Sequence, residues 1–129
     1  MSQQPVHIAV LPDPPYYVAL FVSQRRPDDG ADYGRMAVAM DELAHQQPGF
    51  LGMESVRDAS GAGITLAYFR TEADLAAWKQ VTAHTEAQRS GRTNWYEDYA
   101  VRVAKVERAY TMTTSPQTGL GEQEHPHAR

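Results

Sequence analysis

Hydrophobic and polar positions divide the chain between residues 16 and 110 into six predicted elements. The stretch from Tyr16 to Val22 is a continuous apolar run, rich in β-forming residues and too short for an isolated helix, which predicts a strand buried on both faces. With Asp32 as the candidate N-cap, apolar residues then recur at three- and four-residue spacing until Pro48 and Gly49. This spacing predicts an amphipathic helix whose inner face carries Met36, Ala37, Met40, Leu43 and Ala44.

The remaining pattern predicts two strands, a helix and a last strand. Residues 50–57 and 64–69 form a predicted hairpin around the Gly-rich loop 58–63. Thr71 opens a second helix that reaches Gly91, and Asp74 completes a weak variant of the capping box. Residues 94–110 predict a long final strand. The order βαββαβ predicts an α+β fold of the ferredoxin-like class, with both helices on one face of the sheet.

The two ends of the chain have a different composition. Residues 1–15 contain four prolines, and residues 111–129 carry only Met112 and Leu120 as large apolar groups. We expect both segments to be mobile, which leaves residues 16–110 as the folded domain. A total of 129 residues agrees with a single domain.

The inventory of core residues is lean in branched side chains. Leu, Ile, Val and Phe together number 22, while there are 18 Ala, 5 Met, 7 Tyr and 2 Trp. The core is therefore predicted to pack small helix residues against aromatic rings and thioethers. Because helices on one face leave the other face of an apolar first strand uncovered, we expect a homodimer in which a second sheet supplies that cover.

Charge and missing motifs exclude several classes of function. The net charge of −4 gives no general grip on a phosphate backbone, so nucleic acid is not an expected partner. The absence of cysteine excludes disulfides and thiolate chemistry, and we expect no metal site. No apolar run approaches about 18 residues, and no basic segment precedes a leader-like run, so we expect a cytoplasmic protein without membrane contact. Phosphate-binding loops and hydrolase motifs are also absent.

The second predicted helix carries the residues best suited to chemistry. Trp78 and His84 are separated by about 120° around the helix axis, so both can border one cavity beside the packed face. Asp74 lies one turn before Trp78 on the same side. Residue type alone favours a simpler interpretation, in which Trp78 belongs to the core and His84 lies in water.

The last predicted strand concentrates aromatic rings and hydroxyl groups. It contains Trp95, Tyr96, Tyr99 and Arg102, which fit contacts to a ligand and fit a dimer interface equally well. Tyr96 and Arg102 are the candidate donors to a substrate anion. The pattern does not determine which alternate residues of this strand face the helices.

Several segments together resemble the antibiotic biosynthesis monooxygenase family. They are residues 47–52, residues 64–69, Ala76-Ala77-Trp78-Lys79 with His84, and the last stretch of the predicted domain, from Trp95-Tyr96 to Tyr110. The resemblance covers about the whole predicted domain and is greatest to the bacterial branch grouped with haem-degrading monooxygenases. It implies a ferredoxin-like, dimeric α+β barrel.

The resemblance implies a cofactor-independent monooxygenase that acts on a reduced aromatic small molecule, such as a quinol or an anthrone. Such members need only take a proton, stabilise the substrate anion and exclude water. By position Trp78 matches a pocket tryptophan of the family, whereas Asp74 and His84 replace an asparagine and a tyrosine. His84 would accept the proton, Trp78 would form the wall against the ring, and Asp74, Tyr96 and Arg102 would line the site.

Two alternatives stay open. Haem-degrading members resemble this chain at Trp78, but their haem-ligating histidine falls nearer Gln88 than His84, and the first strand offers Ser23 or Gln24 where they have asparagine. Haem is the alternative cofactor, with none expected otherwise. The third interpretation is a barrel without catalytic activity that binds a small aromatic ligand.

Overall fold

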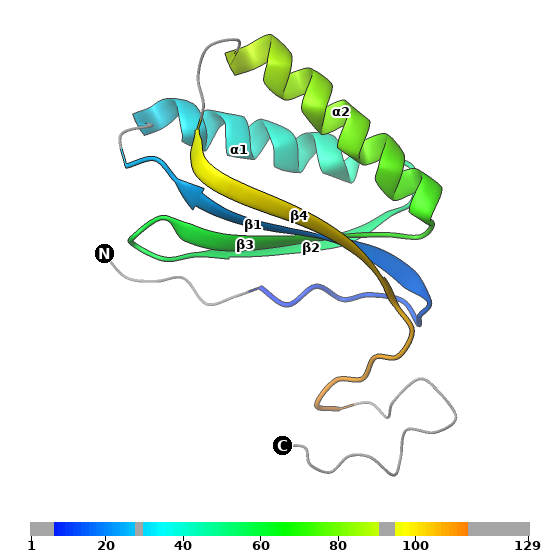
Figure 1. Ribbon diagram of the computed structural model, residues 1–129. Helices are drawn as coiled ribbons and strands as arrows, with labels where there is room; N and C mark the ends of the chain where they lie inside the picture. The colour runs from blue at the N-terminus through cyan, green and yellow to red at the C-terminus, as the bar shows by residue number, and fades with distance from the viewer. Residues whose placement is uncertain (1–6, 28–29, 91–94, 114–129) are drawn as a thin grey trace.

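The six predicted elements are all present in the computed structural model, which describes residues 7–27, 30–90 and 95–113 (Figure 1). In chain order they are β1 (Tyr16–Arg25), α1 (Gly30–His45), β2 (Phe50–Arg57), β3 (Ala62–Phe69), α2 (Glu72–Ser90) and β4 (Tyr96–Val106). The order βαββαβ and the ferredoxin-like class are thereby confirmed.

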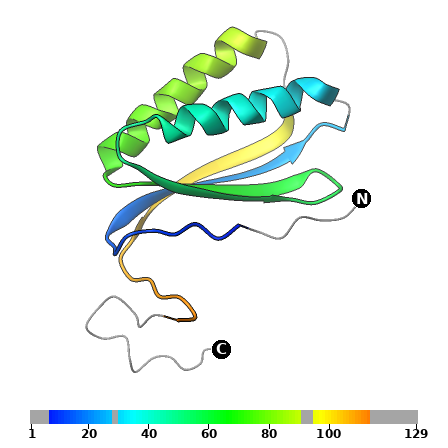
Figure 2. The same ribbon diagram turned by 180° about the vertical axis from the view of Figure 1, so that it is seen from behind.

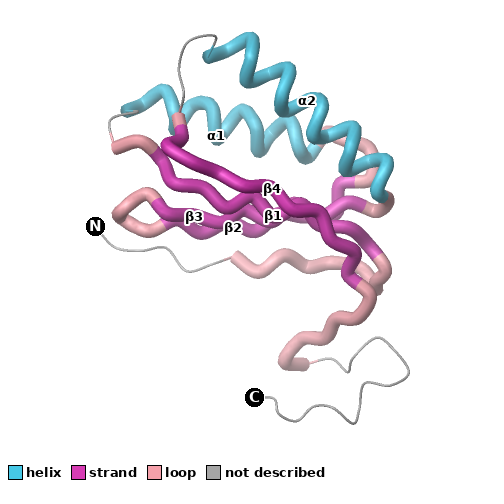
Figure 3. Tube along the Cα trace, viewed as in Figure 1, coloured by secondary structure: helices cyan, strands magenta, loops and turns pink. Residues whose placement is uncertain are grey.

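The four strands form one antiparallel sheet in the order β2-β3-β1-β4. Both helices cover the same face of this sheet, as the two opposite views show (Figures 1 and 2). Residues 7–15, ahead of β1, run along the other face (Figure 3). The sheet therefore has a helix-facing side and an outer side, and each strand presents alternate residues to one or the other.

The boundaries of several elements differ from those predicted. Strand β3 begins at Ala62, within the predicted loop 58–63. Strand β1 does not end at Val22 but continues to Arg25, because residues 23–25 pair with β4 on one side and residues 23 and 24 also pair with β3 on the other. Helix α1 begins at Gly30, so Asp32 lies within the first turn and not at the cap. Strand β4 ends at Val106 and leaves residues 107–110 outside the sheet.

Small residues and aromatic rings build the core between helices and sheet. Its buried members are Ala19, Ala44, Ala67, Phe69, Leu75 and Trp78, and Met40 and Met53 pack around them. The predicted composition of the core is thus confirmed. The predicted start of α2 is also confirmed, because the Thr71 hydroxyl accepts a hydrogen bond from the Asp74 amide at 3.0 Å.

On the outer side, a carboxylate ties the N-terminal segment to the sheet. Glu54 accepts hydrogen bonds from the Tyr68 hydroxyl at 2.7 Å and from the Ala9 amide at 3.0 Å. Burial and the Glu54 carboxylate together raise the pKa of Tyr68. Leu11 and Ala9 lie so close to Gly52 that a Cβ at position 52 would approach them at 3.0 and 3.1 Å.

None of the helices in the described part of the chain is long and apolar enough to cross a membrane.

Candidate functional site

Trp78 lies in the core, on the helix-facing side of the sheet. Its side chain is 7% exposed and its ring stacks on Phe69, with 6.3 Å between centroids and 29° between planes. Phe69 is itself fully buried. The indole therefore offers a ligand little more than an edge, and its principal contacts are with the core, as residue type alone suggests.

Asp74 lies at the start of α2, packed against the turn that precedes β2. Gly49 in that turn has φ of +77°, a left-handed conformation that favours glycine. A Cβ at Gly49 would lie 2.1 Å from Asp74 Oδ2, so the carboxylate occupies the space that glycine leaves. Strand β1 separates this turn from Tyr96: Tyr17 at its start pairs with Phe69, and Arg25 at its end pairs with Tyr96. Asp74 and Tyr96 are therefore at opposite ends of the sheet.

Along α2 the side chains become more exposed toward the carboxyl end of the helix. Leu75 and Trp78 are buried and Val81 is half-buried, whereas His84, about 120° around the helix axis from Trp78, is exposed. In both opposite views α2 rises away from the sheet in this direction (Figures 1 and 2). The carboxyl half of α2 lies toward the end of the sheet where β1 ends and β4 begins (Figures 1 and 2), and His84 belongs to that half of the helix.

Aromatic rings line the sheet at this end. Phe21 shares the helix-facing parity of Ala19, and its ring lies 5.2 Å from that of Tyr96 and 5.4 Å from that of Tyr99. The two tyrosine rings are 6.0 Å apart. We call Phe21, Tyr96 and Tyr99 the aromatic cluster. Tyr96 is half-buried and Tyr99 is exposed, so both can contact a ligand.

Two other residues proposed from the last strand are placed differently. Arg102 pairs with Leu20, so it points to the outer side of the sheet, away from Tyr96 and the helices. One small anion cannot be held by both Tyr96 and Arg102 of the same chain. Trp95 is 6% exposed and directly precedes β4, where its carbonyl accepts a hydrogen bond from the Arg26 amide at 2.9 Å.

A cation beside the aromatic cluster was missed by sequence reasoning. Arg57, the last residue of β2, donates from Nη2 to the Ser23 hydroxyl at 2.9 Å and from Nη1 to the Gly61 carbonyl. Its Cζ lies 6.0 Å from the centre of the Tyr96 ring, within cation–π range. The alternation of side chains along a strand could have placed Arg57 in the sequence. Arg57 is four residues after Met53, so both side chains lie on the same side of β2.

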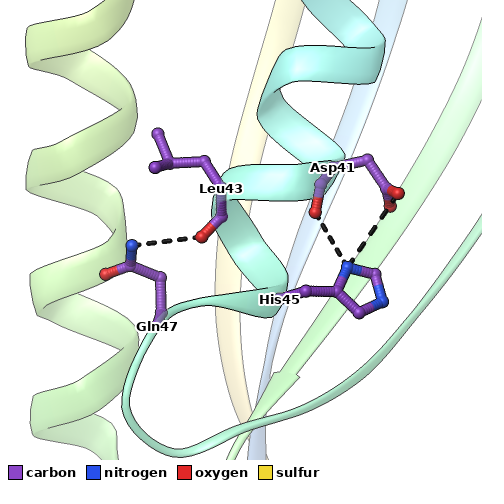
Figure 4. Close-up of polar contacts among 4 residues, drawn as sticks. All are labelled: Asp41, Leu43, His45 and Gln47. Carbon is purple, nitrogen blue, oxygen red and sulfur yellow. Dashed lines mark hydrogen bonds and ion pairs between the residues drawn. The ribbon is translucent and has the colours of Figure 1, made fainter.

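A separate cavity of about 500 Å³ lies at the free edge of β2, where α1 ends. Its lining includes His45, Asp41 and Glu54. His45 Nδ1 donates to the Asp41 carbonyl at 2.8 Å (Figure 4), so Nε2 is the acceptor of the neutral ring. The Phe50 ring lies 4.8 Å from the imidazole. Within the described residues, no group of three or more histidines and carboxylates is arranged to hold a metal ion.

The fold and the helix-facing site define a small ferredoxin-like α+β protein, and comparison with known proteins gives its family. The model of the antibiotic biosynthesis monooxygenase family matches residues 16–90, and the chain belongs to this family. The chain is 50% identical over 97 residues to the uncharacterized protein YqjZ of Bacillus subtilis (strain 168), a match that covers 75% of this chain and 84% of the relative.

Two solved structures share the fold. A Nitrosomonas europaea protein that carries the same family name superposes with a TM-score of 0.59 at 18% identity, over 70% of this chain and 89% of the other. The protein PA3566 of Pseudomonas aeruginosa superposes with a TM-score of 0.57 at 13% identity, over 75% and 97% of the two chains. At these identities the likeness extends to the fold alone.

Proposed function

We propose that this protein is a monooxygenase that transfers one atom of O₂ to a reduced aromatic molecule of the quinol or anthrone type, with no cofactor of its own. The observation that supports this proposal is the aromatic cluster on the helix-facing side, where β1 ends and β4 begins, with the Arg57 guanidinium beside it. His84 lies in the carboxyl half of α2, which covers the same face of the sheet (Figures 1 and 2). A flat phenolic ring can pack against the exposed ring of Tyr99, and a cation nearby favours the anionic form.

The reaction balances without an external reductant. For an anthrone, the ring CH₂ becomes a carbonyl, one atom of O₂ enters that carbonyl and the other leaves as water. The substrate supplies all four electrons. The protein must take a proton to form the electron-rich anion, hold the anion in place and keep water away while it passes an electron to O₂.

Each residue then has a definite task. His84 accepts the substrate proton, because imidazole is the side chain that works as a base near neutral pH. Tyr96 donates a hydrogen bond to the oxyanion from the sheet. Trp78 supports the wall of the site from within the core. The proposal gives Asp74 no part in the reaction, since its carboxylate packs beside Gly49, at the end of the sheet away from Tyr96.

Oxygen uptake by the purified protein, tested against a panel of anthrones and hydroquinones, decides the proposal. We expect uptake above the spontaneous rate, and a decrease of about 10²-fold or more in His84→Ala because general-base catalysis contributes that much. His45→Ala is the matched control, since His45 is also an exposed helical histidine but lies at the far end of α1.

Uptake equal to the spontaneous rate for every substrate refutes the oxygenase. A haem titration of the same preparation then tests the alternative cofactor. An unchanged rate in His84→Ala removes this histidine from the mechanism and leaves the oxygenase itself standing.

We also propose that a second copy of the chain covers the outer side of the sheet. Val56, Ile64 and Val22 are paired neighbours across β2, β3 and β1 on this side, and each is about 40–50% exposed. Sedimentation of the wild type should give a dimer, and Ile64→Glu should give a monomer. Val38→Glu, which places the same charge on the exposed side of α1, should remain dimeric. A monomeric wild type at micromolar concentration refutes this assembly.

A further inference from the structure

The cavity beside β2 is a groove that follows the free edge of this strand. Its volume is about 500 Å³, and its lining includes five consecutive residues of β2, residues 51–55. Consecutive residues of a strand point to opposite faces, so a cavity that all five line must lie at the edge of the sheet. β2 is the outermost strand here, and β3 is the only described strand that pairs with it. Alternate residues of β2 therefore direct backbone N–H and C=O groups into the groove.

Two walls from distant parts of the chain border this edge. On the helix-facing side, the carboxyl end of α1 contributes Asp41 and His45 to the lining. On the outer side, the segment ahead of β1 contributes Ala9 and Val10. The Ala9 amide donates to the Glu54 carboxylate at 3.0 Å, which fixes this segment to β2. Figure 2 shows α1 on one face of β2 and the N-terminal segment on the other, so the groove between them has the direction of a strand.

The walls also carry negative charge. Asp41 and Glu54 line the groove, and the described lining contains no lysine or arginine. The hydrogen bonds that Glu54 accepts come from neutral groups, the Tyr68 hydroxyl at 2.7 Å and the Ala9 amide at 3.0 Å. Glu54 pairs with Leu66 and therefore points to the outer side, whereas Asp41 lies on the helix that covers the other side. One carboxylate thus lies on each side of the free edge.

An extended peptide fits this combination of a strand edge and two acidic walls. Successive side chains of an added strand point to opposite faces, so two neighbouring basic residues would each reach one carboxylate, Asp41 or Glu54. Its backbone would take up the unpaired groups of β2. Residues 51–55 span about 17 Å at the rise of a strand, which is room for about five peptide residues.

We propose that this groove binds an extended, basic segment of another protein, which pairs with the free edge of β2 as an additional strand. The backbone of β2 supplies the hydrogen bonds, and the carboxylates of Asp41 and Glu54 select the charge. The groove is separate from the aromatic cluster, which is built on β1 and β4. The inference is therefore independent of the proposed oxygenase.

A short labelled peptide tests the charge preference. The probe is Thr-Val-Lys-Arg-Val-Thr with blocked ends, and its counterpart replaces the two basic residues with two glutamates. Fluorescence anisotropy at low salt and mildly alkaline pH, where an ordinary imidazole is neutral, gives both affinities. We expect the wild type to bind the basic peptide about tenfold or more tightly than the acidic one, and we expect salt to reduce this difference.

Methylation of the probe separates strand pairing from simple charge attraction. Neighbouring backbone amides point to opposite edges of a strand, so N-methyl groups on the lysine and arginine amides block both edges. This peptide should bind about tenfold or more weakly, because a backbone hydrogen bond is lost and the methyl group clashes. The matched control carries the same two methyl groups on the side-chain nitrogens, keeps both charges and should bind within about twofold of the parent.

Variants of Asp41 test the wall on α1. Asp41→Asn should weaken the basic peptide about two- to fivefold, as for an exposed ion pair. Asp41→Lys should weaken it further and strengthen the acidic peptide. Glu42→Gln is the matched control, because Glu42 is the neighbouring exposed carboxylate of α1 and is not among the lining residues. Its affinity should equal that of the wild type, and circular dichroism checks that each variant is folded.

Several results would overturn the proposal. They are no binding of the basic peptide by the wild type, equal binding of the basic and acidic peptides, and equal binding of the two methylated peptides. A folded Asp41→Asn that binds as tightly as Glu42→Gln also refutes it. A peptide that binds only while it dissociates a dimer in sedimentation assigns the edge to a second copy instead. Oxygen uptake is measured without any peptide, so the proposed function stands or fails separately.

Discussion

The contact between Gly49 and Asp74 makes a quantitative prediction about stability. Gly49→Ala places a side chain at φ +77°, which costs about 1–2 kcal/mol for an L-residue. The new Cβ also meets Asp74 Oδ2 at 2.1 Å and Cγ at 2.6 Å, so the carboxylate and the first turn of α2 must move. Overpacking of this kind costs about 1–3 kcal/mol. We therefore expect Gly49→Ala to lower the free energy of unfolding by about 2–5 kcal/mol.

A double-mutant cycle separates the two contributions. In Asp74→Ala both overlapping atoms are gone and only the Asp74 Cβ position, 3.0 Å away, remains close. Adding Gly49→Ala to that background should cost only the backbone part, about 1–2 kcal/mol, which gives a coupling of about 1 kcal/mol or more. Urea unfolding followed by far-UV circular dichroism measures all four proteins. Equal costs in both backgrounds, within about 0.5 kcal/mol, refute the steric account of Asp74.

Three further predictions concern the core, the outer side and the site. Trp78→Ala should destabilise the fold by about 3–5 kcal/mol in urea unfolding, because the ring is buried on Phe69; a loss below about 1 kcal/mol contradicts its place in the core. The raised pKa of Tyr68 means that the folded state favours the neutral phenol. Its contribution to stability is full below the ordinary value of about 10 and decreases as pH rises above it, so Tyr68→Phe should lose less stability than the wild type in alkali. The ultraviolet absorbance of tyrosinate should show that Glu54→Gln lowers the pKa of Tyr68, and an unchanged titration contradicts that cause. Gly63→Ala should lower the free energy of unfolding by about 1–3 kcal/mol in urea, because its Cβ would lie 2.6 Å from Arg57 Cζ and the guanidinium would have to move; an unchanged stability contradicts this contact.

The order of elements was predictable because each element carries its own local signal. The Thr71 cap, the Pro48-Gly49 stop and the spacing of Met36, Met40 and Leu43 are all properties of neighbouring residues. The predicted end of β1, at Val22, was wrong because it also rested on neighbouring residues alone. Ser23 and Arg25 look like a polar terminus from their neighbours alone, whereas in the sheet Ser23 faces Arg57 from two strands away.

The candidate site could be predicted only in part. Tyr96 could be singled out from its residue type, but its separation from Arg102 depends on the register of β4 against β1. Parity alone places Arg57 on the same side of β2 as Met53, but its position beside Ser23 and Gly63 follows only from the pairing of three strands. Local pattern contains no such information, because Ser23 and its partner Gly63 are 40 positions apart in the chain.

The two tryptophans of this chain are intrinsic fluorescence probes. Trp78 points from α2 into the core, and Trp95 directly precedes β4. Both side chains are buried in the folded state. Their emission should therefore be blue-shifted together and move to longer wavelength on unfolding. Because Trp95 precedes Tyr96 directly while Trp78 stacks on Phe69, a single-indole variant of each kind would let one spectrum follow the ligand end and the other follow the core, with no extrinsic label attached.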